Sequence, residues 1–488
     1  MKSIIITIGS LLMTAFSCTA QVLPDHKVQE IKDKVSQQAD PIISVAPNAE
    51  IGALGYYYDA KAVGTLAYEF GYSLVRMEQA MREYTSVPNP KPRTSYRAPL
   101  NKIGWAKRLP TAADKDMPTA NNDTYYMSAV VDLSEPYILE TPNTNGRYFV
   151  VNVFDMYHNL VEYIGKRNTG TTALKVALIP EGWEGDLPND IDKKVIVKTD
   201  KAWLWGRIHV LEGENIKKLH LLQDQFKLRS LSESKGYENM NKQTELPEMP
   251  VFPTSDSLRF YKYLAFALSQ NPTYTEDISL VGQFERIGIK GGKFSTDNLN
   301  EHQIKGLKEA AIEAPLAILS SMYSSSVTSN GWNIATKLDN YGYDFPFRSL
   351  ISGPYLGGQG EKEAMYPIRF IDSDNAPVEG KNSYTITFDE EPPVDSFWSL
   401  TLYDATNKLF CDNSLNRYKF SSESKGLKKN KDGSFTIVIQ NEEPKNTDNW
   451  LPAPKGGFYL IMRLYQPHQS VIDLEYKLPQ LIKKKEIL

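Results

Sequence analysis

The segment PTANNDTYYMSAVVDLSE, residues 118–135, joins a polar cluster to a β-patterned run. Two amides, a carboxylate and a hydroxyl (Asn121, Asn122, Asp123 and Thr124) stand directly before its apolar residues. Aromatic and β-branched residues, which fill TYYMSAVV, are enriched in strands, so this run predicts a strand that begins near Thr124. The polar residues before it allow two interpretations: a turn that opens the strand, or the rim of a binding site.

Similar short runs continue along the chain, separated by turn residues such as Asn145-Gly146. The first series is PYILE, RYFVVNVF, LVEYIGKR, KVALIP, KKVIVK and WLWGRIHVL. A second series follows Pro367 and contains SYTITFD, FWSLTLYD, KLFCDN, SFTIVIQ and FYLIMRLYQP. Short strands at this spacing, without helices between them, predict two antiparallel sandwiches.

Helical periodicity occupies the segments 60–85 and 257–325, where apolar residues recur at intervals of three and four. Pro315 lies inside the second segment and predicts a kink or break there. We therefore expect a mainly β fold with an α-helical connector and two antiparallel β-sandwich (jelly-roll-like) domains. The expected division is as follows: signal peptide 1–20, N-terminal extension 21–59, helix and loop 60–118, first β-sandwich 119–235, helical connector 236–364, second β-sandwich 365–470 and C-terminal tail 471–488.

The first twenty residues have the pattern of a secretory signal peptide: Lys2, a short apolar run, and small residues that end at Ala20. We expect export, with a mature chain that begins at Gln21 in the periplasm or medium. Cys18 allows a second interpretation, a lipoprotein anchored through that cysteine, although the bulky Phe16 makes the lipobox imperfect. No later segment has the length of apolar sequence that a membrane-spanning helix needs.

Composition argues against several classes of function. The net charge of −4 gives no general attraction to nucleic acid. After removal of the signal, Cys411 is the single cysteine, so an intrachain disulfide is excluded. The histidines lack HxH, HxxxH or HExxH spacing, and GGQG at 357–360 lacks the context of a phosphate-binding loop, so we predict no metal and no cofactor. The oligomeric state is left open.

Two long segments resemble known families. NNDTYYMSAVVDLSEPYILETPNTNGRYFVVNVFDMYHNLVEYIGKRNTGTTA, with WLWGRIHV and LLQDQFKL after it, resembles domain-of-unknown-function family 1254. EAMYP, PVEGKNSYTITFDEEPPVDSFWSLTLYDATNKLFCDNSLNRY and FYLIMRLYQP resemble family 1214, its usual C-terminal companion. The resemblance implies an exported or envelope bacterial protein with two β-sandwich domains and a helical connector. It implies no mechanism, because both families are named for lacking one.

Charged residues at strand ends give the first candidate site. If the first four strands form a simple meander, alternate strand ends meet at the same edge of the sheet. Asp123, Arg147 and Arg167 would then gather at one end, whereas Asp132 and Asp155 would lie at the other. The structural interpretation of this cluster is a salt bridge that caps a sheet end. The functional interpretation is an anion or sugar pocket, with Asp123 as acid or base and two guanidiniums as donors.

Further candidates for substrate binding are Asn121, Asn122, Tyr125, Tyr403, Trp450 and Arg463. In FWSLTLYD and FYLIMRLYQ, period-two alternation places Leu400 and Met462 on core faces. Tyr403 and Arg463 lie on the opposite faces, which predicts a surface that meets either a ligand or the neighbouring domain. Two functions remain: a hydrolase or lyase acting on a carbohydrate-like or small acidic substrate, or a non-catalytic glycan- or ligand-binding or structural protein of the envelope.

Overall fold

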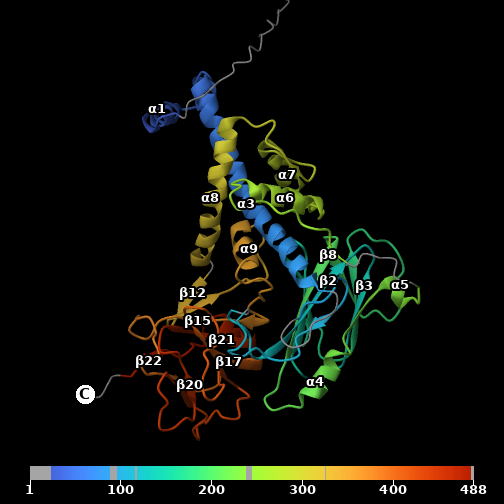
Figure 1. The fold of residues 1–488 in the computed structure, drawn as a ribbon, viewed down its shortest axis with the longest axis vertical. Coiled ribbons are helices and arrows are strands. Elements are labelled where there is room, and N and C mark those ends of the chain that lie inside the picture. Colours follow the sequence, from blue (N-terminus) through green and yellow to red (C-terminus); the bar gives the residue numbers. More distant parts are fainter. Residues whose placement is uncertain (1–22, 88–95, 116–117, 238–244, 325, 485–488) are drawn as a thin grey trace, which may run out of the picture.

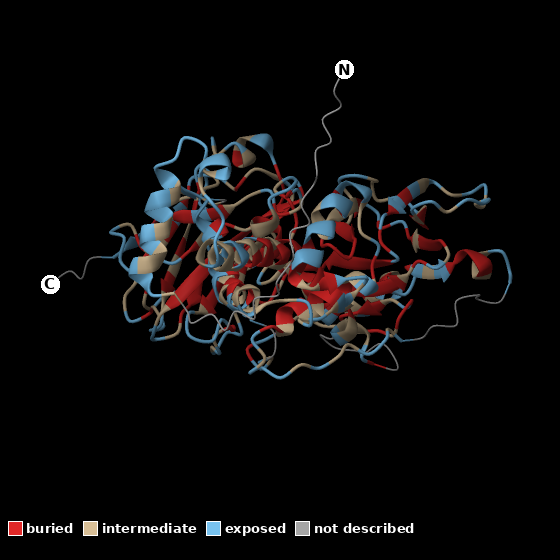
Figure 2. Ribbon diagram, turned by 90° about the horizontal axis from the view of Figure 1, so that it is seen from above, coloured by how far each residue is buried: buried red, intermediate tan, exposed pale blue. Residues whose placement is uncertain are grey.

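The computed structural model describes residues 23–87, 96–115, 118–237, 245–324 and 326–484. The expected signal segment and the alternative anchor Cys18 lie outside these residues. The chain forms two β regions and a long helical arm that rises from them (Figure 1). Buried residues are concentrated in the two β regions and along the helices between them (Figure 2).

The first β region contains two sheets packed face to face. One sheet has the order β1-β2-β8-β4-β5, with β1 (Gly104–Trp105), β2 (Thr124–Asp132), β4 (Phe149–Phe154), β5 (Leu160–Gly165) and β8 (Lys201–His209). The other has the order β7-β6-β3-β9, with β3 (Tyr137–Thr141), β6 (Leu174–Pro180), β7 (Lys193–Val197) and β9 (Lys227–Ser230). Met127, Val151 and Leu204 pack from the first sheet against Leu139 and Leu178 of the second. Two short helices, α4 (Ile216–Gln223) and α5 (Leu231–Ser234), complete this region.

The second β region also pairs two sheets around a core of its own. The larger follows the path β12-β13-β15-β21-β17-β18, with β14 beside β21; its strands are β12 (Ser326–Ser329), β13 (Trp332–Ala335), β14 (Ala364–Met365), β15 (Ile368–Arg369), β17 (Val394–Asp404), β18 (Lys419–Ser421) and β21 (Phe458–Pro467). The smaller is β20-β19-β16-β22, with β16 (Tyr384–Phe388), β19 (Phe435–Gln440), β20 (Trp450–Pro452) and β22 (Leu481–Lys483). The helix α10 (Gln469–Ile472) follows β21.

The alternation predicted for the two long strands of this region is confirmed. Leu400 and Met462 lie in the core between the two sheets. Phe397 and Tyr465 lie on the opposite face, where they pack against Tyr148 of the first region. This second face is therefore where the two β regions meet.

The helical arm is built from α1 (Asp25–Ser36), α2 (Pro41–Ser44), α3 (Ala49–Thr85), α6 (Arg259–Ser269), α7 (Ile278–Gly282), α8 (Glu301–Ser324) and α9 (Phe345–Ser352), with η1 (Thr275–Asp277), η2 (Gln283–Ile287) and a small ribbon of β10 (Ile289–Lys290) and β11 (Lys293–Phe294). Asn48 caps α3 by accepting a hydrogen bond from the backbone N–H of Ile51 at 2.9 Å. The C-terminal half of α3 lies on the β2–β8–β4 sheet, where Tyr84 stacks with Trp203 and Trp205. The arm therefore covers the face of this sheet that the second sheet does not. Within the described ranges, none of the helices combines the length and apolarity that a membrane span needs.

Three features of the fold differ from the sequence prediction. The structure is 28% helix and 26% strand, a mixed α/β fold rather than a mainly β one, because α3 begins at Ala49 and the arm adds further helices. The described residues form several antiparallel sheets and the long α3–α8 pair, with no closed barrel or jelly roll. The helix α8 continues through Pro315 without a break.

The predicted meander is also wrong. The strand PYILE (β3) leaves the first sheet and joins the second, and β8 occupies the place between β2 and β4. Because β8 is antiparallel to both neighbours, β2 and β4 still begin at the same edge. The strand ends therefore gather as predicted, although a different strand joins them.

Candidate functional site

One edge of the first sheet faces the second β region. Thr124 at the start of β2 lies opposite His209 at the end of β8, and Phe149 at the start of β4 lies opposite Ile208. Gly165, the last residue of β5, lies opposite Val150. Residues that flank these strand ends are consequently directed toward the junction between the two regions.

Asp123 is fully buried at this junction. Its carboxylate accepts a hydrogen bond from the hydroxyl of Ser399 at 2.6 Å and forms an ion pair with Lys419. Burial alone would raise the pKa of Asp123, but Lys419 and Arg463 outweigh it and hold the pKa below its usual value. The predicted acid or base is thus an ionised carboxylate whose partners belong to the second region.

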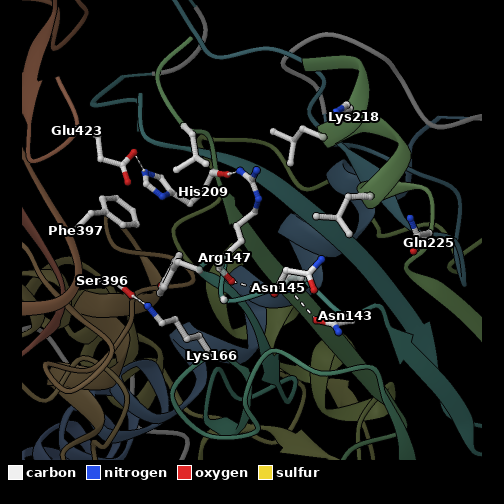
Figure 3. A pocket seen from close by; sticks show the side chains of 16 residues that line it. Asn143, Asn145, Arg147, Lys166, His209, Lys218, Gln225, Ser396, Phe397 and Glu423 are labelled. Atoms are coloured by element: carbon white, nitrogen blue, oxygen red, sulfur yellow. Dashed lines mark hydrogen bonds and ion pairs between the residues drawn. The ribbon is translucent and has the colours of Figure 1, made fainter. Parts of the chain in front are cut away.

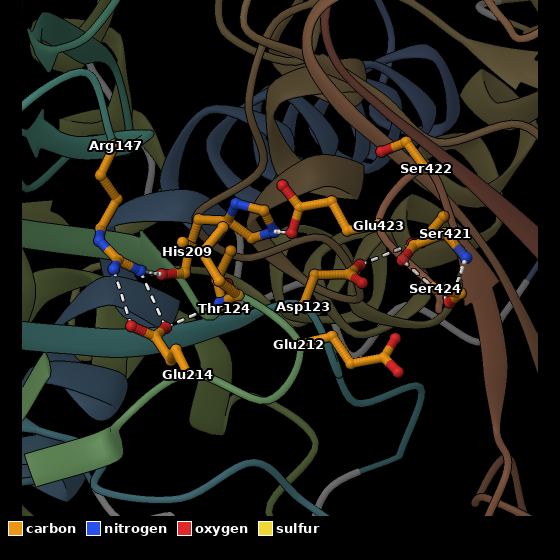
Figure 4. A network of polar contacts seen from close by, with 12 residues as sticks. Asp123, Thr124, Arg147, His209, Glu212, Glu214, Ser421, Ser422, Glu423 and Ser424 are labelled. Atoms are coloured by element: carbon orange, nitrogen blue, oxygen red, sulfur yellow. Dashed lines mark hydrogen bonds and ion pairs between the residues drawn. The ribbon is translucent and has the colours of Figure 1, made fainter. Parts of the chain in front are cut away.

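The two predicted arginines pair with other carboxylates. Arg147 forms a bidentate pair with Glu214, with N–O distances of 2.9 and 2.7 Å (Figure 4). Arg167 donates from Nε to Glu363 at 2.8 Å, and Glu363 also accepts from the hydroxyl of Tyr148. Among the described residues, none of the predicted charged trio forms an ion pair with another member. The structure brings the three to one sheet end and gives each a separate partner.

His209 is a residue of this junction that the sequence prediction missed. Its ring stacks on Phe397, with centroids 3.6 Å apart, and its Nε2 lies 3.4 Å from the Glu423 carboxylate (Figure 4). Burial lowers the pKa of His209 to about 3, so the imidazole is neutral at physiological pH. Burial raises the pKa of Glu423. The available signal in the sequence was a histidine within the largely apolar run WLWGRIHVL.

A cavity of about 650 Å³, here called the junction cavity, opens on one side of His209 (Figure 3). Both β regions contribute to its walls. Its polar lining residues are Asn143, Asn145, Arg147, Lys166, Lys218, Gln225, Ser396, His209 and Glu423. Three of these are cations and one is a carboxylate, although Arg147 is already paired with Glu214. The cavity is therefore rich in donors for an anion.

A second cavity, of about 530 Å³, lies on the other side of the same histidine. Its walls are the segment after β8, including Glu212 and Glu214, and residues around β18, including Lys419 and Glu423. His209 and Glu423 line both cavities, whereas Asp123 lines neither. The group best placed to meet a ligand is the histidine rather than the predicted aspartate.

The candidate binding residues from the first β region lie in different environments. Asn122 lines the second cavity, and its side-chain amide donates to the carbonyl of Pro110 at 2.6 Å. Asn121 donates to the hydroxyl of Tyr465 at 2.6 Å and accepts from the backbone N–H of Asp123, as an Asx turn does. Tyr125 is buried between the sheets of the first region. The turn and site interpretations of the opening segment both hold in part, because its amides order the turn beside the cavity.

The remaining three candidates lie in β strands of the second region and are buried. Arg463 donates to the hydroxyls of Thr401 at 3.0 Å and Tyr403 at 2.8 Å. Trp450 belongs to β20, and its indole N–H donates to the carbonyl of Gln440 at 3.0 Å. The Tyr403 hydroxyl also donates to the carbonyl of Ala120, and Arg463 donates to the carbonyl of Thr119 at 3.4 Å, so both residues bind the segment before β2 to the second region. Within the described ranges, no group of three or more His, Cys, Asp or Glu residues is placed to hold a metal ion.

Comparison with known families now identifies the class of protein. Residues 100–230 match the model Protein of unknown function (DUF1254), and residues 363–469 match Protein of unknown function (DUF1214). The chain therefore contains a DUF1254 region followed by a DUF1214 region, which confirms the resemblance seen in the sequence. No curated protein matches the chain.

Two solved bacterial structures are similar to it. The crystal structure of the VPA0106 protein from Vibrio parahaemolyticus is 26% identical, with a TM-score of 0.67, and the match covers 87% of this chain and 100% of that chain. A putative uncharacterized protein from Burkholderia cenocepacia is 12% identical, with a TM-score of 0.40, over 94% of this chain and 95% of that chain. The first similarity covers most of this chain and all of the other, so the two proteins share the overall fold.

Proposed function

We propose that the protein binds a small anionic ligand, a carboxylate or a phosphate ester, in the junction cavity. The observation that carries this proposal is the cavity wall, where three cations and several amides face one carboxylate. Lys166 is fixed by hydrogen bonds to the Ser396 hydroxyl at 3.0 Å and the Asp395 carbonyl at 3.2 Å. Cations held in a concave site attract anions more strongly than cations on an open surface.

Lys218 offers the cleanest test of this proposal. It is exposed on α4 and lines the cavity, so its side chain can be shortened without disturbing a core. Isothermal titration of small carboxylates, phosphate and sugar phosphates should identify a ligand. Lys218→Met should weaken its binding about tenfold, because a partly screened charge contact contributes about 1.4 kcal/mol. Lys290→Met, a change at an exposed lysine on β10, is the matched control and should leave the affinity unchanged.

Salt provides an independent check on the same proposal. Raising the ionic strength should weaken the binding of a charged ligand, since screening shortens the reach of cavity cations. Binding that is indifferent to salt and to Lys218→Met would contradict the proposal. Failure of every anion in the panel would do so as well.

The second candidate function is hydrolysis or elimination on a carbohydrate-like or acidic substrate in the same cavity. The observation that favours it is the neutral His209 beside Glu423, because an unprotonated imidazole can accept a proton. Its lowered pKa makes it a weak base, which is why ligand binding is placed first. Turnover of a bound ligand that is lost in His209→Gln, with affinity retained, would establish catalysis.

We also propose that the protein acts outside the cytoplasm. The support is the signal-like N-terminal sequence and its small residues before Gln21. N-terminal sequencing of the native protein should find Gln21, and a lipidated Cys18 would establish the alternative of a membrane-anchored lipoprotein.

A further inference from the structure

The opposite end of the first sheet carries a second pocket, of about 470 Å³. It lies between the turn that joins β4 to β5, the short helix η1 and the segment that leads into α9. We call it the Asp155 pocket. Asp155 follows β4 directly, so this pocket and the junction cavity are separated by the length of the strands.

Arg348 is the most unusual residue of the Asp155 pocket. Its side chain is almost fully buried, and its guanidinium lies over the rings of Phe70, Tyr157 and Phe345 at 5.5, 5.8 and 5.0 Å. Nη2 donates to the carbonyl of Phe70 at 3.0 Å, but the buried Nε has no acceptor. Among the described residues, no carboxylate lies within ion-pair distance of this guanidinium. A buried donor without a partner is costly in a folded protein and is a common mark of a ligand site.

Two buried carboxylates face the same pocket. Asp155 accepts backbone hydrogen bonds from Tyr157 at 2.8 Å and Asn159 at 2.9 Å, and it also accepts from the hydroxyl of Tyr274. Asp277 is 5% exposed and lines the pocket as well. These partners hold Asp155 and Tyr274 in fixed positions, so this part of the pocket is preorganised.

The charges of the pocket do not select a strongly charged ligand. Two cations, Arg348 and Lys198, and four carboxylates line it. Glu276 is paired with Lys198 at 2.7 Å, and Asp339 accepts a hydrogen bond from the Tyr163 hydroxyl at 2.7 Å, which leaves Asp155 and Asp277 beside Arg348. Asp155 and Asp277 oppose an anion, whereas Arg348 opposes a cation. A neutral ligand that offers both donors and acceptors satisfies all of them.

Aromatic rings provide the rest of the lining. Tyr274, Tyr341 and Phe345 line the pocket, and Tyr343, which is 73% exposed, stands with them. An aromatic face attracts the polarised C–H groups on one side of a sugar ring, while carboxylate, amide and guanidinium groups bind its hydroxyls. This combination of rings with mixed polar groups is therefore suited to a saccharide.

A larger cavity, of about 1130 Å³, adjoins the pocket and shares with it the residues Leu160, Asp339, Asn340, Tyr341 and Gly342. The shared loop is anchored to the first sheet. Tyr163 donates to Asp339 at 2.7 Å, and the Tyr341 hydroxyl lies 3.3 Å from Nδ1 of the buried His158. The two cavities offer room for more than one sugar unit along a fixed loop.

We propose that the Asp155 pocket is a binding site for a neutral oligosaccharide, with Tyr343 as a stacking platform, with Arg348 and Asp277 as hydroxyl ligands, and with Asp155 holding Tyr274 in place. This site is separate from the junction cavity and does not depend on its function. An oligosaccharide would extend from the pocket over the shared loop toward the larger cavity. Nothing in this proposal requires catalysis.

The test titrates the full chain with maltotetraose, cellotetraose, chitotetraose and mannotetraose by calorimetry. At least one should bind, and Tyr343→Ala should weaken it about tenfold or more. Tyr237→Ala removes a tyrosine of similar exposure (70%) in the first β region and is the matched control. Lys218→Met should leave saccharide binding unchanged, which separates this site from the junction cavity.

Arg348→Lys is a second variant, which keeps the charge and loses the forked donors. It should weaken saccharide binding at least as much as Tyr343→Ala, and circular dichroism reports whether it stays folded. Tyr343 is exposed, so that variant remains decisive if Arg348→Lys unfolds. Absence of binding by all four saccharides, or equal affinities of wild type and Tyr343→Ala, would overturn the proposal.

Discussion

The two ends of the first sheet use charge in different ways. At the junction end, Asp123, Arg147 and Arg167 each have a direct partner of opposite charge. At the other end, Arg348 has three aromatic rings around it and no carboxylate in direct contact within the described residues. At the junction, ion pairs hold two regions together. At the other end, a buried guanidinium with an unpaired N–H donor can still bind a ligand. Strand-end charges in a sequence do not distinguish these cases.

The largest effect is expected at Asp123. Asp123→Asn should lower the free energy of unfolding by about 3 kcal/mol, because the partly buried Lys419 and the buried Arg463 would lose their carboxylate. Chemical denaturation measures this directly. Asp190→Asn breaks an exposed pair with Lys175 and should have no measurable effect. If Asp123→Asn is as stable as wild type, the Asp123 carboxylate does not stabilise the junction between the two β regions.

Each sheet end also contains a buried neutral histidine, His209 at the junction and His158 at the other end. Burial lowers the folded-state pKa of both to about 3, whereas the unfolded chain protonates them near 6.5. The unfolded state therefore takes up the proton first, so this stability is complete above pH 6.5 and is lost as the pH falls toward 3. Each histidine should contribute a slope of about 1.4 kcal/mol per pH unit in that window.

Single variants separate the two contributions. The unfolding free energy of His209→Gln and of His158→Gln is measured between about pH 4 and 6. In each variant its slope against pH should be smaller than in wild type by about 1.4 kcal/mol per pH unit, the contribution of one histidine. A slope unchanged in His209→Gln would mean that this ring is already protonated in the folded protein. The cavity beside it would then carry a further positive charge.

A smaller loss is expected from Glu214→Gln. Arg147 and Glu214 are mostly buried, and the bidentate geometry makes two charge-assisted hydrogen bonds. The variant should lose about 1–2 kcal/mol of unfolding free energy. It should also leave Arg147 free to bind anions, so affinity for the junction ligand should rise while stability falls. A fall in stability together with a rise in affinity would distinguish the Arg147–Glu214 pair from the Asp123 pair. A fall in both stability and affinity would contradict the placement of Arg147 beside the cavity.

The smallest effect on stability is expected from Tyr343→Ala. The side chain is exposed at the mouth of the Asp155 pocket, so the unfolding free energy should change by less than about 0.5 kcal/mol. A thermal melt is sufficient to check this. A large loss would show that Tyr343 packs against the arm, and its role as a platform would fail.

Much of the local structure was predictable from the sequence. Period-two alternation predicted that Leu400 and Met462 face a core and that Tyr403 and Arg463 lie on the opposite faces, toward either a ligand or the neighbouring domain. The gathering of strand ends was also predicted, although for the wrong connection. It survived because any antiparallel strand between β2 and β4 leaves their starting edges together.

The partners of the charged residues were not predictable in this way. Lys419 lies 296 residues from Asp123, and Glu363 lies 196 residues from Arg167. Such contacts depend on how the two β regions dock, which no local period encodes. His209 and Arg348 were missed for the same reason, because burial and missing partners are properties of the assembled fold.

A crystal structure of the protein soaked with a mixture of small carboxylates, phosphate esters and tetrasaccharides tests the central contrast most directly. The account predicts an anion in the junction cavity beside His209 and Lys218, and a saccharide in the Asp155 pocket against Tyr343 and Arg348. An anion at Arg348, a saccharide at His209, or no ligand at either sheet end would contradict it.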